Sequence, residues 1–200
     1  MNEYAFVFKV IAAAIMGFSL SACAGIRAFL PLAAVSIASK FGSLIGYNLP
    51  LTEYFTWLSS WPSVICFTTA VIIEIIADKF PAIDNILDAA AFLLKPIAGA
   101  FIAAAVMTKM PPLLQAVLAI IIGGGIAEGV HLIKAGVRGL STVGTAGTAN
   151  TVISIIEDIG STILVILSFV IPILSAILIV ILFIIVFKYM KNKKKLQVAR

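Results

Sequence analysis

Long, unbroken apolar stretches separated by short polar ones dominate the chain. The clearest of them cover residues 5–25, 62–77, 89–108, 113–133 and 161–187. A helix that crosses a membrane needs about 20 mostly apolar residues, and backbone groups in hydrocarbon must find their hydrogen bonds within their own segment. The pattern therefore predicts an all-α, polytopic membrane protein. Its longest predicted crossing is residues 161–187, with a kink at Pro172.

Two uncharged stretches do not have the form of an ordinary crossing. Residues 28–39 are apolar but span only about 12 positions, a length typical of re-entrant or interfacial pieces. Residues 139–156 are crowded with Gly, Ser and Thr, which suits a broken helix that faces protein or water. We expect broken or re-entrant helices at both places. Residues 41–61 contain two Tyr and two Trp, which indicates a loop at a membrane surface.

The composition agrees with this pattern. Of the 200 residues, 62% are hydrophobic and 12% are charged, and the mean hydropathy is +1.18. Soluble domains carry about 45–50% apolar and about 25% charged residues, so a soluble protein and a large extramembrane catalytic domain are both excluded. We expect one transmembrane domain over residues 1–187, in contact with the lipid bilayer, and a basic tail over residues 188–200.

The positive charge of the chain is concentrated in that tail. The formal net charge is +5, yet six of the 14 Lys and Arg residues come after residue 187: Lys188, Lys191, Lys193, Lys194, Lys195 and Arg200. A basic cluster directly after a long apolar segment indicates a cytoplasmic end. It gives no support to nucleic-acid binding, because without the tail the balance of charge is slightly negative.

A short motif occurs twice along the chain. The sequence AGIR at residues 24–27 is echoed by AGVR at residues 135–138, each time at the end of an apolar helix. Downstream, IIAD at residues 75–78 is echoed by IIED at residues 155–158. We interpret this ordered series as an internal duplication.

The two repeats would cover residues 5–108 and 113–187. Related halves of a transporter can form a site between them at mid-membrane. If residues 28–39 re-enter, the halves are inverted, and if they cross, the halves are parallel. We favour inversion because this stretch is short for a crossing.

Several segments together resemble a known family. They are AGIRAFLPL at residues 24–32, EIIADKFPAIDNILD at residues 74–88, KPIAGA at residues 95–100, and the run from residue 135 to residue 161. The chain is similar here to small bacterial integral membrane proteins catalogued as domain of unknown function 4126. The resemblance implies an α-helical protein of the bacterial inner membrane and no established activity. Where the family usually has a proline, this chain has Thr151.

The recurring charges are the first candidates for function. Charged groups inside a membrane are costly, by about 2.5–3.5 kcal/mol each, so they normally face a partner or a wet cavity. Arg27 and Arg138 occupy matching positions, as do Asp78 and Asp158, next to Glu157. Pairing between the arginines and these carboxylates would satisfy all of them. Such pairs either belong to a transport site or lock helices together.

Glu74 and Lys95 are the next candidates, because each lies inside an apolar segment. Glu74 is four residues before Asp78 and shares its helix face. Lys95 precedes Pro96, whose ring leaves a carbonyl unbonded one turn earlier. Lys95 either reaches to the membrane surface or lines the site, and we favour the site.

The run rich in Thr and Gly, residues 141–151, offers hydroxyl groups and close backbone approach without charge. Broken helices present backbone dipoles to small ions, so we expect this run to contact a substrate, while tight helix packing through small residues is the alternative. The candidate residues are Ser141, Thr142, Thr145, Thr148 and Asn150.

The remaining chemistry-bearing residues give weaker signals. Glu128 and His131 have the E-x-x-H spacing of di-metal bundles, but there is no second copy, so a helix-packing hydrogen bond is the preferred role for His131. Cys23 and Cys66 form neither a disulfide framework nor a metal-binding spacing. The sequence LSAC at residues 20–23 has the form of a bacterial lipoprotein cleavage site. More membrane-like sequence follows it, however, and we interpret residues 5–25 as a retained helix.

The sequence favours a small secondary transporter or channel-like carrier of a small solute or ion. The arginines expected in the site would suit an anionic solute. Its pathway would lie at the repeat interface, within a homodimer. We expect no enzyme, no catalytic residue, no metal and no cofactor. The alternatives are a membrane scaffold or assembly protein, in which the charges are packing locks, and a membrane enzyme that acts on lipid phosphates.

Overall fold

The computed structural model describes residues 3–78, 81–145 and 150–198. Within these ranges the description does not extend to the side chains of residues 3, 5, 81–89, 143, 145, 151, 182, 186, 187 and 189–198. The elements follow one another as α1 (Glu3–Ile26), α2 (Leu30–Phe41), η1 (Gly42–Ile45), η2 (Glu53–Ser59), α3 (Trp61–Ala77), α4 (Pro81–Val106), α5 (Pro112–Leu118), η3 (Ala119–Gly124), α6 (Gly125–Thr145), α7 (Asn150–Val170) and α8 (Pro172–Val198). The predicted all-α class is confirmed in these residues.

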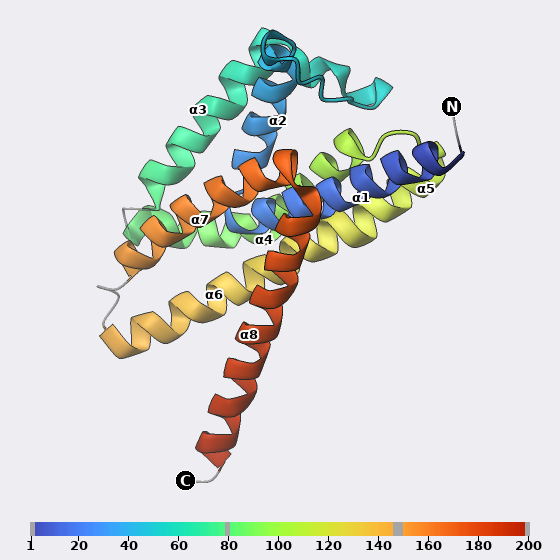
Figure 1. The fold of residues 1–200 in the computed structure, drawn as a ribbon. Coiled ribbons are helices and arrows are strands. Elements are labelled where there is room, and N and C mark those ends of the chain that lie inside the picture. Colours follow the sequence, from blue (N-terminus) through green and yellow to red (C-terminus); the bar gives the residue numbers. More distant parts are fainter. Residues whose placement is uncertain (1–2, 79–80, 146–149, 199–200) are drawn as a thin grey trace.

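A bundle formed by α1, α4 and the continuous helix α5–η3–α6 is the centre of the fold (Figure 1). Small residues bring these helices close together. A side chain at Gly99 would meet the Cβ of Ala127 and the carbonyl of Gly123, and one at Gly25 would meet the carbonyl of Ala127. Close approach of this kind is typical of helices that pack in membranes. The buried core lies along the same seam and includes Leu20 and Ile102.

Buried serines add hydrogen bonds between these helices. The hydroxyl of Ser21, in α1, donates to the carbonyl of Gly99, in α4, at 2.8 Å. Ser175, in α8, donates to Ser19, in α1, at 2.7 Å. Each hydroxyl therefore has a hydrogen-bond partner on another helix, as buried polar groups normally do. These bonds fix the relative positions of the helices in the C-terminal part of α1.

A second group of helices, α2 and α3, projects from one side of the bundle, while α7 lies across α1 (Figure 1). The predicted surface loop connects α2 to α3 and contains η1 and η2. Its rings pack against the bundle and against α3: Phe55 meets Phe101 with centroids 4.7 Å apart, and Phe41 meets Trp61 at 5.5 Å. Trp61 and Tyr54 expose 56% and 76% of their surface, as rings at a membrane surface do.

The predicted single crossing over residues 161–187 is wrong. The helix stops at Val170 and a second helix starts at Pro172, which lies at its first position. Proline has no N–H to donate and its ring obstructs the preceding turn, so the expected kink becomes a complete break. The two helices diverge: α7 packs along α1, whereas α8 packs against α1 only near its own start and then leaves the bundle (Figure 1).

Among the residues that the structure describes, three helices are long and apolar enough to cross a membrane: Phe6–Ile26, Pro112–Thr142 and Val152–Val170. A fourth candidate is the pair of η2 and α3, which meet at an angle of 71°. Residues 28–39 fall mostly in α2, a helix of 12 residues. Residues 139–156 comprise the end of α6 and the start of α7, with residues 146–149 outside the described part. Crossing or re-entry at these two places stays a prediction.

The directions of the helices bear on the predicted duplication. The two helices that end in AGxR run the same way, because Phe18 lines one pocket with Leu118 and Ile122, whereas the carbonyl of Ile26 meets Lys134 further along. The two helices that carry IIxD run in opposite ways, since α3 ends at the contacts of Arg27 and α7 begins near them. The two pairs of helices are thus oriented differently. The structure therefore does not show the repeats or their inversion.

Candidate functional site

Six buried or half-buried charged side chains meet where α1 and α3 end. We call this group the charge cluster; it consists of Arg27, Lys134, Arg138, Asp78, Glu157 and Asp158. Arg27 is its most buried member, with 1% of its side chain exposed. Its Nη1 atom lies 2.6 Å from Oδ2 of Asp78, and its Nη2 atom pairs with Asp158. Arg27 thus joins α1 to both α3 and α7.

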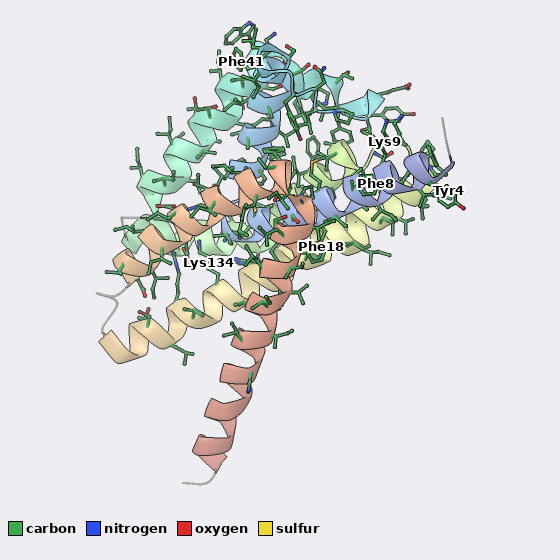
Figure 2. The ribbon with its side chains drawn as sticks, in the orientation of Figure 1. Tyr4, Phe8, Lys9, Phe18, Phe41 and Lys134 are labelled. Carbon is green, nitrogen blue, oxygen red and sulfur yellow. The ribbon has the colours of Figure 1, made fainter. Side chains whose placement is uncertain are left out.

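The two cations of α6 complete the cluster. Arg138 donates to Asp78 at 3.3 Å and to Glu157 at 3.0 Å. Lys134 lies 3.0 Å from Glu157 and donates to the carbonyl of Ile26 at 3.1 Å. Lys134 is labelled in Figure 2, in the region where α6 faces α1 and α7. Three cations therefore face three carboxylates in the described part of the chain.

The cluster confirms that the recurring charges converge, although the pairing is not the simple one expected from the repeat. Asp78 is shared between Arg27 and Arg138, and Glu157 takes part as fully as Asp158. Burying charges costs several kcal/mol per ion unless the partners are well placed. Each arginine contacts two carboxylates, and this double compensation reduces the cost of burying its charge.

Glu74 has a different role from the cluster carboxylates. Its two carboxylate oxygens accept hydrogen bonds from the backbone N–H groups of Ala28, at 2.9 Å, and Phe29, at 3.2 Å. The start of α2 has no side-chain cap of its own, and N–H groups at a helix start need an acceptor. Glu74 of α3 supplies this acceptor from another helix, and its negative charge suits the positive end of the α2 dipole.

A polar cavity of about 270 Å³ lies beside the charge cluster. Apolar residues of α3, α4 and the two positions before α2 form most of its wall, together with four charged residues: Glu74, Asp78, Lys95 and Lys134. Asp78 and Lys134 belong to both the cavity and the charge cluster. The cavity therefore gives direct access to the carboxylate that the two arginines share.

Lys95 lines the polar cavity, as the sequence favoured. Its Nζ atom lies 3.0 Å from Nδ1 of His131, so α4 and α6 are joined by a buried hydrogen bond. An ammonium group only donates hydrogen bonds, and therefore Nδ1 of His131 is the acceptor. The expected helix-packing role of His131 is confirmed.

Two members of the cluster lie at helix ends. Arg27 directly follows the span Phe6–Ile26, and Asp78 directly follows α3. A helix end leaves backbone groups unbonded, and charged side chains satisfy some of them, as Lys134 does for Ile26. The other four lie within α6 and α7, and the expected mid-membrane position stays a prediction.

The run rich in Thr and Gly adjoins the cluster but not the polar cavity. Thr142 donates to the carbonyl of Arg138 at 2.9 Å and accepts from Asn150 at 2.9 Å. Ser141 is half-buried one residue earlier. None of these three lines the polar cavity in the described structure. The side chain of Thr145 and the whole of Thr148 lie outside the described residues.

Two members of the site were missed in the sequence. Lys134 precedes Arg138 by four residues, and Ser154, which accepts from Nη2 of Arg27 at 3.3 Å, precedes Asp158 by four. Residues four apart lie on one helix face, so this spacing from a recurring charge was the available signal. It was weak because Lys134 lies just beyond an apolar stretch and has the appearance of a flanking charge.

The comparison with protein families agrees with the resemblance found in the sequence. The model of a family described as "Domain of unknown function (DUF4126)" matches residues 14–192. No curated protein and no solved structure matches the chain. The matched residues include the whole charge cluster, every residue that lines the polar cavity, and most of each helix around them. The chain belongs to the DUF4126 family.

Proposed function

We propose that this protein is a small secondary transporter or channel-like carrier in which the charge cluster is the gate and the polar cavity admits a small solute or ion. The observation that carries the proposal is the shared position of Asp78 and Lys134, which belong to both. A group that entered the polar cavity would compete directly for the ion pairs that hold α1, α3 and α6 together.

The balance of charges suggests how the gate works. The carboxylates compensate the arginines in the closed cluster, so an anion reaches a guanidinium group only when a carboxylate releases it. Protonation of Asp78 would remove one of the two carboxylate partners of Arg27 and of Arg138 at the same time, because both donate to it. An anion could then bind bidentately to the planar guanidinium groups. Entry of the anion would be coupled to uptake of a proton.

The size of the polar cavity favours a small cargo. Pockets for drug-sized ligands have volumes of about 300–1,000 Å³, and this one is about 270 Å³. It suits an inorganic anion or a short carboxylic acid with its water. The finer expectations, a pathway between repeats in a homodimer of the inner membrane with a cytoplasmic C-terminus, remain part of the proposal.

A scaffold role is the second candidate, and one observation favours it. Arg27 contacts two carboxylates, a hydroxyl group and the backbone carbonyl of Glu74. An arginine with so many protein partners is also what a permanent lock between helices requires. The two candidates differ in whether the arrangement ever opens.

Flux in proteoliposomes separates the two. Purified protein in vesicles would be given inward gradients of chloride, nitrate, phosphate or acetate, with a pH-sensitive dye inside. We expect at least one of these anions to enter together with protons. Replacing both arginines, as Arg27→Gln with Arg138→Gln, should reduce this flux at least about tenfold.

The control is Lys40→Gln, which removes a cation that lies over the Trp61 ring, 5.4 Å from its centroid, and outside the charge cluster. It should leave the flux unchanged. The proposal fails if the folded double variant transports as the native protein does, or if no anion of the set moves. Absence of flux together with a stoichiometric protein partner after mild purification would establish the scaffold role instead.

A further inference from the structure

An apolar groove of about 800 Å³ runs along the seam between α4 and the continuous helix α5–η3–α6. It is separate from the polar cavity. One end is marked by Gln115, whose amide bonds to the carbonyl of Ala104, and by the rings of Phe55 and Phe101. The other end is lined by Glu128. The volume lies in the usual range for pockets that hold drug-sized molecules.

Glu128 is the acidic residue of this groove, and its surroundings do not satisfy it. Both carboxylate oxygens are buried, and neither has a hydrogen-bond partner among the described residues. The nearby cations are engaged elsewhere, since Lys95 bonds to His131 one turn along α6 and Lys134 bonds to Glu157. A buried carboxylate without a donor is costly in an apolar environment.

The place of Glu128 along its helix limits what can reach it. The span Pro112–Thr142 has 31 residues, and Glu128 lies near its middle. A carboxylate at this depth is far from the headgroups of a bilayer. Amine-bearing phospholipids keep their charge at the membrane surface, so their headgroups do not reach it. A molecule that carries a positive charge into hydrocarbon does.

We propose that the groove between α4 and α5–η3–α6 binds a lipophilic cation, a molecule with one positive charge on an apolar or aromatic body. The charge would be attracted to Glu128 across a medium of low dielectric constant, where attraction extends beyond direct contact. Apolar walls would accept the body, and the rings of Phe55 and Phe101, at the other end of the groove, would pack against its apolar or aromatic part.

A second copy of this chain is a poorer occupant. It would have to present a cation at mid-span, and the exposed cations of the described structure are Lys9 near the start of α1, Lys109 between α4 and α5, and Lys188 beyond the apolar part of α8. The exposed mid-span residues of α3 and α7 are apolar, for example Ile72 and Ile163. A dimer through this groove would leave Glu128 without a partner.

Two glycines make a matched pair of variants. Gly125 lines the groove, and a side chain added there would meet nothing within 4 Å, so Gly125→Leu should fill the groove without disturbing the helix. Gly139 lies on the same helix outside the groove and is equally open. Gly139→Leu is therefore the control. Glu128→Gln removes the charge and keeps the shape.

The binding test uses two ions of the same shape and opposite charge. Detergent-solubilised protein would be equilibrated with radiolabelled tetraphenylphosphonium, empty micelles serving as the blank, and tetraphenylborate would be added as a competitor. We expect saturable binding of the cation that tetraphenylborate does not displace. Glu128→Gln should weaken binding at least about tenfold, Gly125→Leu should abolish it, and Gly139→Leu should leave it unchanged.

Each contrary result overturns the proposal. Equal competition by tetraphenylborate would mean that shape alone matters, and unchanged binding in folded Glu128→Gln would remove the carboxylate from the site. A shift from dimer to monomer in Gly125→Leu, without saturable binding to the native protein, would identify a second copy as the occupant. The test is independent of the proposed transport, because the variants that lack Arg27 and Arg138 should still bind tetraphenylphosphonium.

Discussion

Arg27 and Asp78 form a buried ion pair, 2.6 Å from Nη1 to Oδ2, that ties the end of α1 to the end of α3. Their side chains expose only 1% and 8% of their surface. Asp78 also accepts from Arg138 at 3.3 Å, so one carboxylate compensates the arginines of both AGxR motifs. The stability of the bundle and the behaviour of the charge cluster therefore depend on the same side chain.

Asp78→Asn should strongly destabilise the protein. Removing one partner of a buried ion pair leaves the other charge uncompensated, at a cost of about 3–5 kcal/mol. Asp158→Asn is the matched variant and should cost less, because Asp158 is 21% exposed and Arg27 keeps Asp78. Thermal unfolding in detergent, followed by tryptophan fluorescence, measures both. Equal losses would show that the pairing of Arg27 with Asp78 is not the dominant one.

Glu74→Ala should loosen the start of α2. The N–H groups of Ala28 and Phe29 would lose their acceptor, and loss of a helix cap costs about 0.5–2 kcal/mol. Hydrogen exchange measured by mass spectrometry should become faster for the segment that contains these two amides. Glu53→Gln, an exposed carboxylate in η2, is the control and should leave that exchange unchanged.

The two glycines of the AGxR motifs should respond in opposite ways to alanine. At Gly25 the new methyl group would meet the carbonyl of Ala127 and the side chain of Val130, so α1 and α6 would be forced apart. Overpacking of this kind costs about 1–3 kcal/mol. At Gly136 nothing lies within 4 Å, and alanine should stabilise the helix by about 0.5–1 kcal/mol. Melting temperatures that moved the same way would contradict the packing described here.

Lys95 and His131 should behave as one unit. Lys95→Met or His131→Phe alone leaves a buried polar partner without its bond, which costs about 1–3 kcal/mol. The double variant removes both groups, and its loss of unfolding free energy should be clearly smaller than the sum of the single losses. A double-mutant cycle in detergent gives the coupling energy. Strict additivity would mean that the 3.0 Å contact has no energetic weight.

Much of the helical architecture follows from the apolar runs. The predicted segment 5–25 corresponds to α1 and 62–77 to α3, with ends that agree within a few residues. The break at Pro172 was placed correctly but judged too mild, because sequence alone does not say whether a neighbour supports the helix across a proline. The relative directions of the packed helices could not be predicted either, because recurring motifs do not determine how their helices are oriented.

The sequence predicts which residues form much of the candidate site better than it predicts how they pair. Arg27, Arg138 and Asp78 converge as the recurring charges suggested. The shared role of Asp78 was not foreseen, because it depends on which helices finally pack together. Glu74 was expected in the site and lines the polar cavity, but its oxygens accept from backbone N–H groups, which only the folded chain brings to it.

The short π-helical segment η3, from Ala119 to Gly124, connects the two halves of the long helix. A π turn holds one residue more than an α turn, and each residue in an α-helix corresponds to about 100° of rotation about its axis. Rewinding η3 as α-helix would turn everything beyond Gly124 like a screw, which would swing Lys134 and Arg138 away from Asp78. A local change of helical winding beside the groove would thus rotate the far end of α6 about the helix axis.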